Sequence, residues 1–559
     1  MKELLKNSSS FLLRRQTHIL SAAFIIMITY ALSSAIGLVK TRLLISAFFG
    51  SKAPLLDVYY AAFVIPDTIF QLLVIGSLSA AFIPTFTRFL AKKASEAWYI
   101  AAMSLNLILM VFMVISGLIF LFAPQFSRLI APGFNSAQIL TMTSLLRVML
   151  IAQLFFCVSG FLTGMIQSHQ RFLIPALAPV AYNLGIIFGI IFLSPSMGIF
   201  GPAWGVVIGA AVHMLIQLPL ALRLGFRFIP RLDLSHPGVR EMIVLIPPRS
   251  AALGIDQIEQ FVSVILASLL ASGSLTILNV ARLLYALPSS LFGVTIGQAA
   301  LPTLSLEYSQ ADKRRFLQTL TDSLLQVAFL ALPLSTLFII LRIPIVRIVF
   351  GASSFPWAAT LLTGKTLAIL ALSASASAIT QLVVRGFYSL HDTRTPLFVG
   401  LGAAVFDTLA GISAVLLFHW GVAGLAIAIS STTIIEALAL VFLLHRRLHL
   451  PSELRHSVIT AFTKMLIISF ITGISLWLPM HLLDQFVFDT THTLPLLALT
   501  LVTTFIGLIT YLFLSFLFRI PQLYELIALT KRISHFHELF SPVTETLSEP
   551  VILPAPDQN

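Results

Sequence analysis

Fourteen apolar segments, each long enough to cross a lipid bilayer, follow one another along this chain. A spanning helix needs about 20 predominantly apolar residues. Breaks at charges, prolines and glycines place the segments near 17–47, 57–91, 97–123, 138–168, 172–194, 199–222, 238–270, 275–307, 314–341, 358–390, 395–418, 420–444, 456–480 and 493–518. Only 10% of the residues are charged and 58% are hydrophobic, so a polar exterior facing water cannot be built. We therefore expect an all-α integral membrane protein with 14 transmembrane helices, which excludes a cytosolic enzyme, a secreted domain and a disordered scaffold.

The lysines and arginines are distributed unequally between the two sets of helix ends. If the N-terminus is cytoplasmic, twenty-two of the 34 lie at cytoplasmic ends, eight lie within spans, and four lie at the opposite ends: Lys52, Arg128, Arg342 and Arg347. Cytoplasmic loops carry an excess of lysine and arginine, so the asymmetry predicts both termini in the cytoplasm. The net charge of +12 then belongs to loops that face anionic lipid. No long soluble basic segment is present that would bind nucleic acid.

An internal repeat relates the first six helices to the next six. Four pairs of similar motifs keep their order, with offsets that grow only from 218 to 223: Ala81 to Thr85 with Ala299 to Thr303, Arg128 to Ile130 with Arg347 to Val349, Gly164 and His169 with Gly386 and His391, and Gly198 and Gly201 with Gly421 and Gly424. The expected domains are therefore a cytoplasmic N-terminus (1–16), an N-lobe (17–222), a C-lobe (238–444), helices 13 and 14 (456–518) and a cytoplasmic tail (519–559). Two parallel copies suit a transporter with a site between its halves.

Charged residues inside the predicted spans are the candidate substrate-binding residues, because burying a charge in lipid is costly. The cavity cations and their partners in this prediction are Lys40, Arg42, Asp57, Asp67, Arg249 and Arg282. Cations on helices 1, 7 and 8 could line one cavity, where guanidinium and ammonium groups would hold a diphosphate. The alternative is that these cations pair with neighbouring acids, Asp256 and Glu259 among them, and only fix helix packing.

Asp407 lies in the middle of helix 11 with no basic neighbour in sequence. A carboxylate in lipid either takes up a proton or binds a cation, so Asp407, Asp256 and Glu259 are candidates for coupling to Na⁺ or H⁺. No other cofactor and no metal site is expected. The chain lacks a P-loop, a His-Glu-x-x-His motif and a Gly-x-Ser-x-Gly motif, and its one cysteine, Cys157, excludes a disulfide. We therefore predict that it is not an enzyme.

Several motifs give the chain a family resemblance. They are Ile36 to Arg42, Asp57 to Phe63, Ile65-Pro66-Asp67, Gly76 to Pro84, Ala131 to Phe134, Arg171 to Pro179, Leu287-Pro288 to Leu301-Pro302, and Gly386 to Ser389. In combination they resemble the MurJ/MviN family of lipid II flippases, in the multidrug/oligosaccharidyl-lipid/polysaccharide exporter superfamily. The resemblance covers helices 1 to 12, and the count of fourteen also fits the family.

This resemblance implies that the chain transports a substrate without making or breaking a covalent bond. The family moves undecaprenyl-diphosphate-linked peptidoglycan precursor (lipid II) from the inner to the outer leaflet of the bacterial cytoplasmic (inner) membrane by alternating access. It serves peptidoglycan biosynthesis, cell wall biogenesis and cell shape. Its cationic cavity receives the diphosphate, a groove by the last two helices is thought to hold the prenyl tail, and membrane potential or Na⁺ is implicated. The implied partners are the lipid-linked precursor, membrane lipids and the cell-wall synthesis machinery, with no nucleic acid.

The family's charged residues carry over only in part. The arginine of its helix 1 motif falls on Lys40, and the helix 2 aspartate falls on Asp57. Its paired helix 2 arginines fall on Phe70 and Gln71, and its helix 8 arginine falls on Leu283, one place after Arg282. The cavity is thus less cationic than the family pattern. Three alternatives follow: a superfamily transporter for another prenyl-diphosphate glycan or a drug or cation, a scaffold that has lost transport, and a membrane glycosyltransferase. Short, acid-poor external loops argue against the last.

Overall fold

The computed structural model describes residues 19–351, 354–449, 451–489 and 492–533. Within these ranges the side chains of 19–27, 51, 79–80, 248–249, 251–253, 256 and 528–533 lie outside the description. The predicted N-terminal segment 1–16 and most of the tail 519–559 also fall outside it. All regular structure in the described residues is helical, and no strand occurs among them. Helices satisfy every backbone hydrogen bond internally, which lipid requires.

The first half of the chain runs from α2 to α10. Its elements are α2 (Ile19–Phe48), η1 (Gly50–Lys52), α3 (Ala53–Phe70), η2 (Gln71–Ile75), η3 (Leu78–Phe82), α4 (Ile83–Lys92), α5 (Ala94–Leu121), α6 (Ala123–Ile130), α7 (Ser136–Ser168), α8 (Leu173–Phe188), η4 (Gly189–Leu193), α9 (Ser194–Met197) and α10 (Phe200–Leu224). The elements η2, η3 and η4 are π-helical segments that continue the neighbouring α-helices.

The second half runs from α11 to α18, and three further helices follow it. The second half contains α11 (Pro237–Ser268), α12 (Ser274–Pro288), η5 (Ser289–Val294), α13 (Thr295–Ser309), α14 (Lys313–Ile340), α15 (Arg342–Phe350), α16 (Trp357–Ser389), α17 (Arg394–Ile412), η6 (Ser413–Leu417) and α18 (Gly421–Leu448). The last three helices are α19 (Ser452–Phe486), α20 (Thr493–Leu517) and α21 (Pro521–Ile533).

Thirteen helices among the described residues are long and apolar enough to cross a membrane. Each agrees with one of the predicted segments, and most helix ends lie within four residues of the predicted ones. The remaining predicted segment, 238–270, forms the 32-residue helix α11, which carries five charged residues and is not among the thirteen. Two short helices, α6 and α15, were not predicted, because eight or nine residues are too few to give a spanning signal.

The element order of the second half repeats that of the first. The π-helical segment η5 begins 218 residues after η2 (289 against 71), and η6 begins 224 residues after η4 (413 against 189). The packing repeats as well: α7 packs against α3, α5 and α10, as α16 packs against α12, α14 and α18. Likewise α2 packs on α8 as α11 packs on α17. These correspondences follow the chain offset of the sequence motifs.

Small residues allow α8 and α10 to pack closely. A Cβ atom on Gly185 would lie 2.3 Å from the Cα atom of Gly209, and one on Gly189 would lie 2.5 Å from the carbonyl oxygen of Gly201. In lipid no hydrophobic force drives helices together, so association depends on van der Waals contact and close backbone approach. The glycines therefore set the spacing of these two helices.

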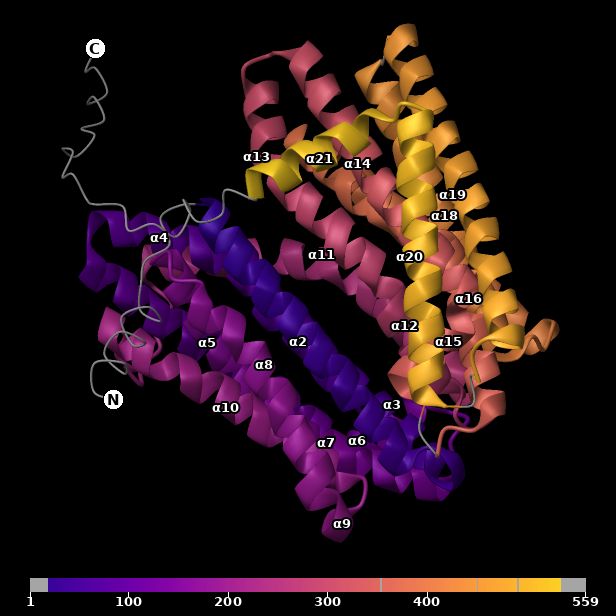
Figure 1. The fold of residues 1–559 in the computed structure, drawn as a ribbon. Helices are drawn as coiled ribbons and strands as arrows, with labels where there is room; N and C mark the ends of the chain where they lie inside the picture. The colour runs from indigo at the N-terminus through magenta and orange to yellow at the C-terminus, as the bar shows by residue number, and fades with distance from the viewer. Residues whose placement is uncertain (1–18, 352–353, 450, 490–491, 534–559) are drawn as a thin grey trace, which may run out of the picture.

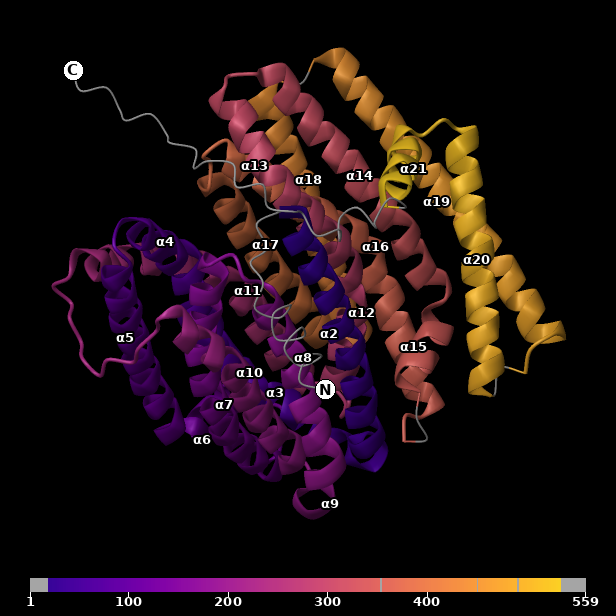
Figure 2. The same ribbon diagram turned by 60° about the vertical axis from the view of Figure 1, so that its left-hand side comes forward.

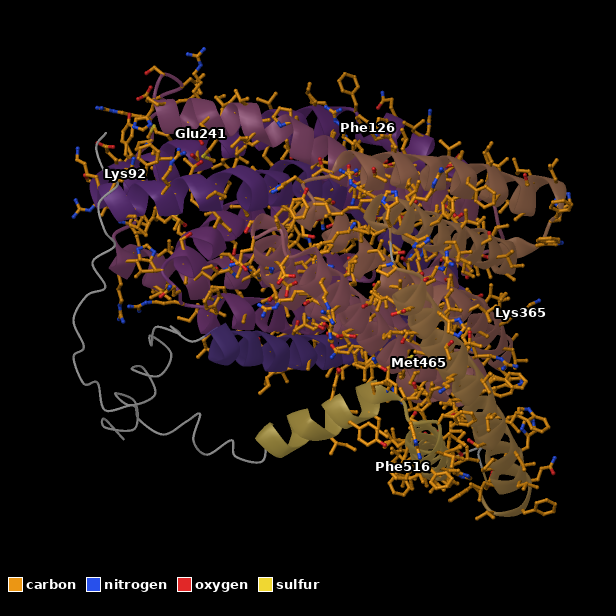
Figure 3. The ribbon with its side chains drawn as sticks, turned by 90° about the horizontal axis from the view of Figure 1, so that it is seen from above. Lys92, Phe126, Glu241, Lys365, Met465 and Phe516 are labelled. Carbon is orange, nitrogen blue, oxygen red and sulfur yellow. The ribbon has the colours of Figure 1, made fainter. Side chains whose placement is uncertain are left out.

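The two halves meet at one end and diverge toward the other, except where α11 packs on the first half (Figures 1 and 2). The junction end, as we call it, holds residues 42–57, 131–135, 268–276, 348–351 and 354–356. The divergent end holds α4, α13 and the loops 225–236 and 390–393, and there α4 and α13 stand apart in both views. The helices α19 and α20 flank the second half, and Figure 3 places Met465 and Phe516 on this flank, away from Lys92 and Glu241 of the first half and α11.

Candidate functional site

Asp57 joins the two halves at the junction end. Its Oδ1 accepts hydrogen bonds from the backbone N–H of Thr276 at 2.8 Å and from the Thr276 hydroxyl at 2.6 Å. Its Oδ2 accepts a hydrogen bond from the backbone N–H of Gly273 at 2.6 Å. The carboxylate therefore caps the N-terminus of α12, where backbone donors lack partners within the helix. Asp57 is 4% exposed, and the described hydrogen bonds of this predicted site residue all come from the opposite half.

Arg42 makes a second link across the junction. Its Nη1 donates a hydrogen bond to the carbonyl oxygen of Ile348 near the end of α15. Close by, the Ser354 hydroxyl donates to a carbonyl at the end of α2 at 2.8 Å. The rings of Phe49 and Phe355 pack with their centroids 4.8 Å apart. The charge of Arg42, which was predicted to face a substrate, is thus directed at the C-terminal carbonyls of a helix, where a cation is favourable.

The loops of the junction pack backbone against backbone. The N–H of Gly133 donates to the hydroxyl of Ser268 at 3.3 Å, and a Cβ atom on Gly133 would lie 2.1 Å from the Ser268 carbonyl oxygen. The charged groups Arg42 and Asp57 bind the opposite half through its backbone and one hydroxyl. Water can replace these backbone and hydroxyl partners one by one, so the halves can separate at this end without breaking an ion pair.

Ion pairs lie at the other end. Within the part of the chain that the structure describes, the four pairs between a lysine or arginine and a carboxylate are all at the divergent end. One joins Arg88 of α4 to Glu241 of α11, and another joins Arg447 of α18 to Asp392. Burial acts to raise the pKa of Asp392, but hydrogen bonds from Thr395 and the Arg447 charge outweigh it and hold that pKa below its usual value. The divergent end, which carries these charged side chains, is therefore the end suited to exposure to water.

Lys40 and Asp67 lie within the first half. Lys40 is half-buried on α2, and no ion pair or hydrogen bond of its ammonium group occurs among the described residues. Asp67 of α3 interacts with the side chain of Gln71 one turn further on, and it lies within electrostatic range of Tyr182 on α8. The sequence left open that Lys40 and Asp67 form an ion pair that only fixes helix packing, but the described residues contain no such ion pair. Lys40 therefore remains a cation available to a ligand.

Arg282 lies in the second half, in a cluster with both coupling candidates whose side chains are described. Its Nη2 donates to the hydroxyl of Ser263 on α11 at 2.7 Å, and its charge interacts with Asp407 and Glu259. Asp407 is 6% exposed, faces the Thr432 side chain of α18, and its Oδ1 has no hydrogen-bond partner. The carboxylates of Asp407 and Glu259, which were predicted to couple transport to an ion, thus lie near the guanidinium of Arg282, which was predicted to bind the substrate.

The predicted cation set does not converge on one point in the described structure. Arg42 binds α15 at the junction, Lys40 lies on α2, and Arg282 interacts with acids of the second half. Arg249 and Asp256 belong to α11, but their side chains lie outside the described residues. A cavity of about 470 Å³ does lie between the halves, with walls from α3, η2, α11 and α17. Its described lining is apolar apart from two side chains that bond to each other, Thr68 and Gln257, at 2.9 Å.

A polar network inside the first half escaped the sequence analysis. His213 of α10 and Ser159 of α7 share a hydrogen bond of 2.6 Å, and Gln217 donates to Ser159 at 2.8 Å and accepts from Thr163 at 2.7 Å. The spacing of His213 and Gln217, one helical turn apart, was a signal that could have found it. The network satisfies itself between two helices, so it fixes their packing.

Comparisons with known proteins agree with this architecture. The profile of the family described as "Lipid II flippase MurJ" matches residues 45–499. The lipid II flippase MurJ of Burkholderia cenocepacia is 28% identical over 428 residues, which cover 74% of this chain and 82% of that protein. The probable lipid II flippase MurJ of Bdellovibrio bacteriovorus is 28% identical over 457 residues, or 79% of this chain and 85% of that protein.

Two solved structures share the fold. The lipid II flippase MurJ in its inward closed conformation superposes with a TM-score of 0.73 at 22% identity, covering 89% of this chain and 98% of that one. An inward-facing multidrug resistance transporter of the MATE family, in the MOP superfamily, gives a TM-score of 0.63 at 15% identity, covering 78% of this chain and 99% of that one. These likenesses concern the fold, whereas the profile match extends over most of the sequence. The chain therefore belongs to the lipid II flippase MurJ family.

Proposed function

We propose that this chain moves lipid II, the lipid-linked precursor of peptidoglycan, from the inner to the outer leaflet of a bacterial inner membrane by alternating access. The observation that carries the proposal is the match of residues 45–499 to the lipid II flippase profile. The fold supports it, because two repeated halves are fastened at the junction end, whereas α4 and α13 stand apart at the divergent end and only α11 is tied to the first half there, through Arg88 and Glu241 among the described residues. The chain is a transporter and not an enzyme.

The orientation belongs to the same proposal. The divergent end faces the cytoplasm, because the lysine and arginine excess lies in its loops and helix ends. Both termini are then cytoplasmic, α11 is the fourteenth spanning helix, and the junction end faces outward. In this arrangement residues 17–222 and 238–444 are the two lobes that move, and α19 and α20 are an added pair. The junction must open for substrate to leave outward.

Lys40 is the residue that we propose binds the diphosphate, together with Arg249 and Arg282 as further cations. Lys40 supports this role because no acid neutralises it among the described residues. A compact ammonium group on a flexible stem can follow a phosphate as the halves move. Arg282 would reach the substrate only if it left Glu259 and Asp407, so substrate binding and the charge state of that cluster are linked in this proposal.

The cluster around Asp407 is the proposed site of ion coupling. Two carboxylates and one guanidinium leave a negative charge that a proton or a Na⁺ ion would balance. The unpartnered Oδ1 of Asp407 supports this assignment, and Asp256 and Glu259 on α11 are the other candidate ligands. Transport of labelled lipid II in vesicles with an imposed Na⁺ or pH gradient tests it: Asp407→Asn should abolish the response to one gradient, and a wild-type response in this variant would exclude the role.

The main test is rescue of a bacterium depleted of its lipid II flippase, with lipid II scored directly in the outer leaflet. The wild-type chain should restore growth and surface lipid II, and Lys40→Ala should not. Lys365→Ala is the matched control, because Lys365 is an exposed lysine of α16. Equal rescue by both variants would show that Lys40 does not bind the substrate.

A second candidate function is transport of another prenyl-diphosphate glycan, or of a drug or cation, by the same fold. The observation that favours it is the presence of Phe70 and Gln71 where the family has its paired helix 2 arginines. Failure of the wild-type chain to restore surface lipid II, together with binding of a different prenyl-diphosphate glycan by the purified protein, would favour this function.

A further inference from the structure

The loop 225–236, which joins α10 of the first half to α11 of the second, runs back along the outside of α5. The side chain of Asn106 on α5 holds the middle of the loop. Its Nδ2 donates to the carbonyl oxygens of Ile229 and Arg231, both at 2.6 Å. Figure 2 shows the loop at the outer edge of the first half, beside α5 and away from the second half. The loop therefore lies on an outer face of the protein rather than between the halves.

The contacts with α5 place the loop below the end of a membrane span. The helix α5 (Ala94–Leu121) is one of the candidate spans, and near its start the Tyr99 hydroxyl donates to Asp233 of the loop at 2.9 Å. Tyrosine collects at the membrane–water interface. Asn106 follows Tyr99 by seven residues, which is about 10 Å along a helix. The middle of the loop thus reaches about 10 Å below the level of Tyr99, where head groups meet acyl chains.

The protein satisfies only part of the loop's backbone at this depth. Besides the two carbonyls held by Asn106, the N–H of Arg231 donates to the carbonyl of Ile229 at 2.8 Å, and Pro230 has no N–H. No backbone hydrogen bond of Arg227 or Phe228 occurs in the described part of the chain. Hydrocarbon offers such groups no partner, whereas water and lipid head groups do. The loop is therefore suited to the head-group boundary and not to the hydrocarbon core.

The apolar side chains of the loop point in two directions. Ile229 packs on the buried cluster that contains Met103 of α5. In contrast, Phe228, Leu232 and Leu234 are 58%, 42% and 48% exposed. Three large apolar side chains exposed on one short loop would be unfavourable in water, but they can enter the acyl boundary of a membrane.

The cations of the loop have no acidic partner. Arg227 and Arg231 are exposed, and no ion pair or hydrogen bond of either guanidinium occurs among the described residues. The loop's one acid, Asp233, accepts hydrogen bonds from the N–H of Ser235 at 2.9 Å and from Tyr99. The guanidinium groups are thus available to bind phosphate, for which their planar donor arrangement is well suited.

We propose that the 225–236 loop is a membrane-embedded segment that binds anionic glycerophospholipids. Arg227 and Arg231 bind the lipid phosphates, and the three exposed apolar side chains lie among the upper acyl chains. A free phosphate ion would leave those apolar side chains in water. In the orientation proposed above the lipids come from the cytoplasmic leaflet, whose anionic head groups attract lysine and arginine. Because the loop joins the two halves, bound lipid holds their connection at the membrane surface.

The test measures the position of the loop in the full-length protein, reconstituted in nanodiscs of phosphatidylcholine and phosphatidylglycerol. A fluorophore is attached to Leu232→Cys, since the native Cys157 is buried. The quenchers are iodide in water and doxyl groups on the acyl chains of either phospholipid, used at equal content. Doxyl lipids should quench more than iodide. Doxyl-phosphatidylglycerol should quench about fivefold more than doxyl-phosphatidylcholine, the enrichment expected for one arginine at an anionic surface, or more.

The double variant Arg227→Gln/Arg231→Gln should remove the preference for phosphatidylglycerol but keep the quenching by doxyl-phosphatidylcholine, because the apolar side chains remain. The matched control is Lys313→Gln/Arg314→Gln, which removes the same charge from exposed positions at the start of α14. It should keep the wild-type preference.

Stronger quenching by iodide than by doxyl lipid would place the loop in water, as for a surface that binds a soluble protein, and would overturn the proposal. Equal quenching by the two lipids in the wild type, or the same loss of preference in both double variants, would overturn it as well. These outcomes do not depend on whether lipid II is flipped.

Discussion

Asp57 should control the equilibrium between closed and open states of the junction end. Its carboxylate accepts three hydrogen bonds from Gly273 and Thr276 of the opposite half. Hydrogen bonds to a charged group contribute about 1.5–3 kcal/mol each. Asparagine keeps one acceptor oxygen but places an N–H₂ group against backbone donors. We therefore expect Asp57→Asn to destabilise the closed junction by about 2–4 kcal/mol, which changes the ratio of the two states roughly 30- to 900-fold.

Spin-label distance measurements across the junction would detect this shift. The chain's one cysteine, Cys157, is buried, so labels will attach to introduced cysteines. Lys52 of the first half and Ala358 of the second half are exposed and suit labelling. The unsubstituted junction should give one short distance, and Asp57→Asn should add a population at longer distance. Alternating access requires the two states to lie within a few kcal/mol, so a shift of this size is measurable.

The control is Asp67→Asn, the same chemical change ten residues further along α3. The described interactions of Asp67 are with Gln71 and Tyr182, within its own half. It should leave the distance distribution unchanged. An unchanged distribution for Asp57→Asn, or equal shifts for both variants, would refute the reasoning that the α12 cap fastens the halves.

Three other predictions follow from the described contacts. Arg42→Gln should weaken the closed junction by about 1–2 kcal/mol through loss of its bond to α15, seen as a smaller shift in the same distance measurement. Gly185→Ala should lower the melting temperature in detergent, because its Cβ would lie 2.3 Å from the α10 backbone. Gly402→Ala, which meets no atom within 4 Å, should not, and equal losses would exclude close packing as the cause. Hydrogen bonds, first from the Ser235 side chain, hold the pKa of Asp233 below its usual value. The ionised Asp233 carboxylate therefore stabilises the 225–236 loop fully above the unfolded pKa of about 4, and this contribution is lost as the pH falls through the lower pKa of the folded state. Proteolysis of the 225–236 loop should increase in wild type at low pH, whereas Asp233→Asn should be cleaved quickly at every pH.

The spanning helices could be predicted closely because lipid imposes a local rule on the chain. Segments 138–168 and 358–390 of the prediction became α7 (Ser136–Ser168) and α16 (Trp357–Ser389). A span must be predominantly apolar whatever its tertiary neighbours, so hydropathy along the chain is sufficient to find it. Segment 238–270 likewise became α11 (Pro237–Ser268), although that helix carries five charged residues.

The partners of the charged residues could not be predicted in the same way. Asp57 was expected beside a substrate and caps a helix 216 residues away in sequence. Arg42 binds a backbone carbonyl 306 residues away. Backbone donors and acceptors are present at nearly every residue and leave no mark in the sequence. The position of Arg282 near Asp407 likewise depends on how α11 and α18 bring α12 and α17 together.

The amino-acid sequence by itself determined the membrane as solvent, the helices and their ends, the repeat of two halves and the family. It could do so because those properties depend on local hydropathy and on motifs that stay contiguous. The tertiary structure alone decided which charges join the halves, which cluster with acids and which stay without a described partner. Those outcomes depend on contacts between residues hundreds of positions apart, whose energies are set by geometry and burial rather than by residue type.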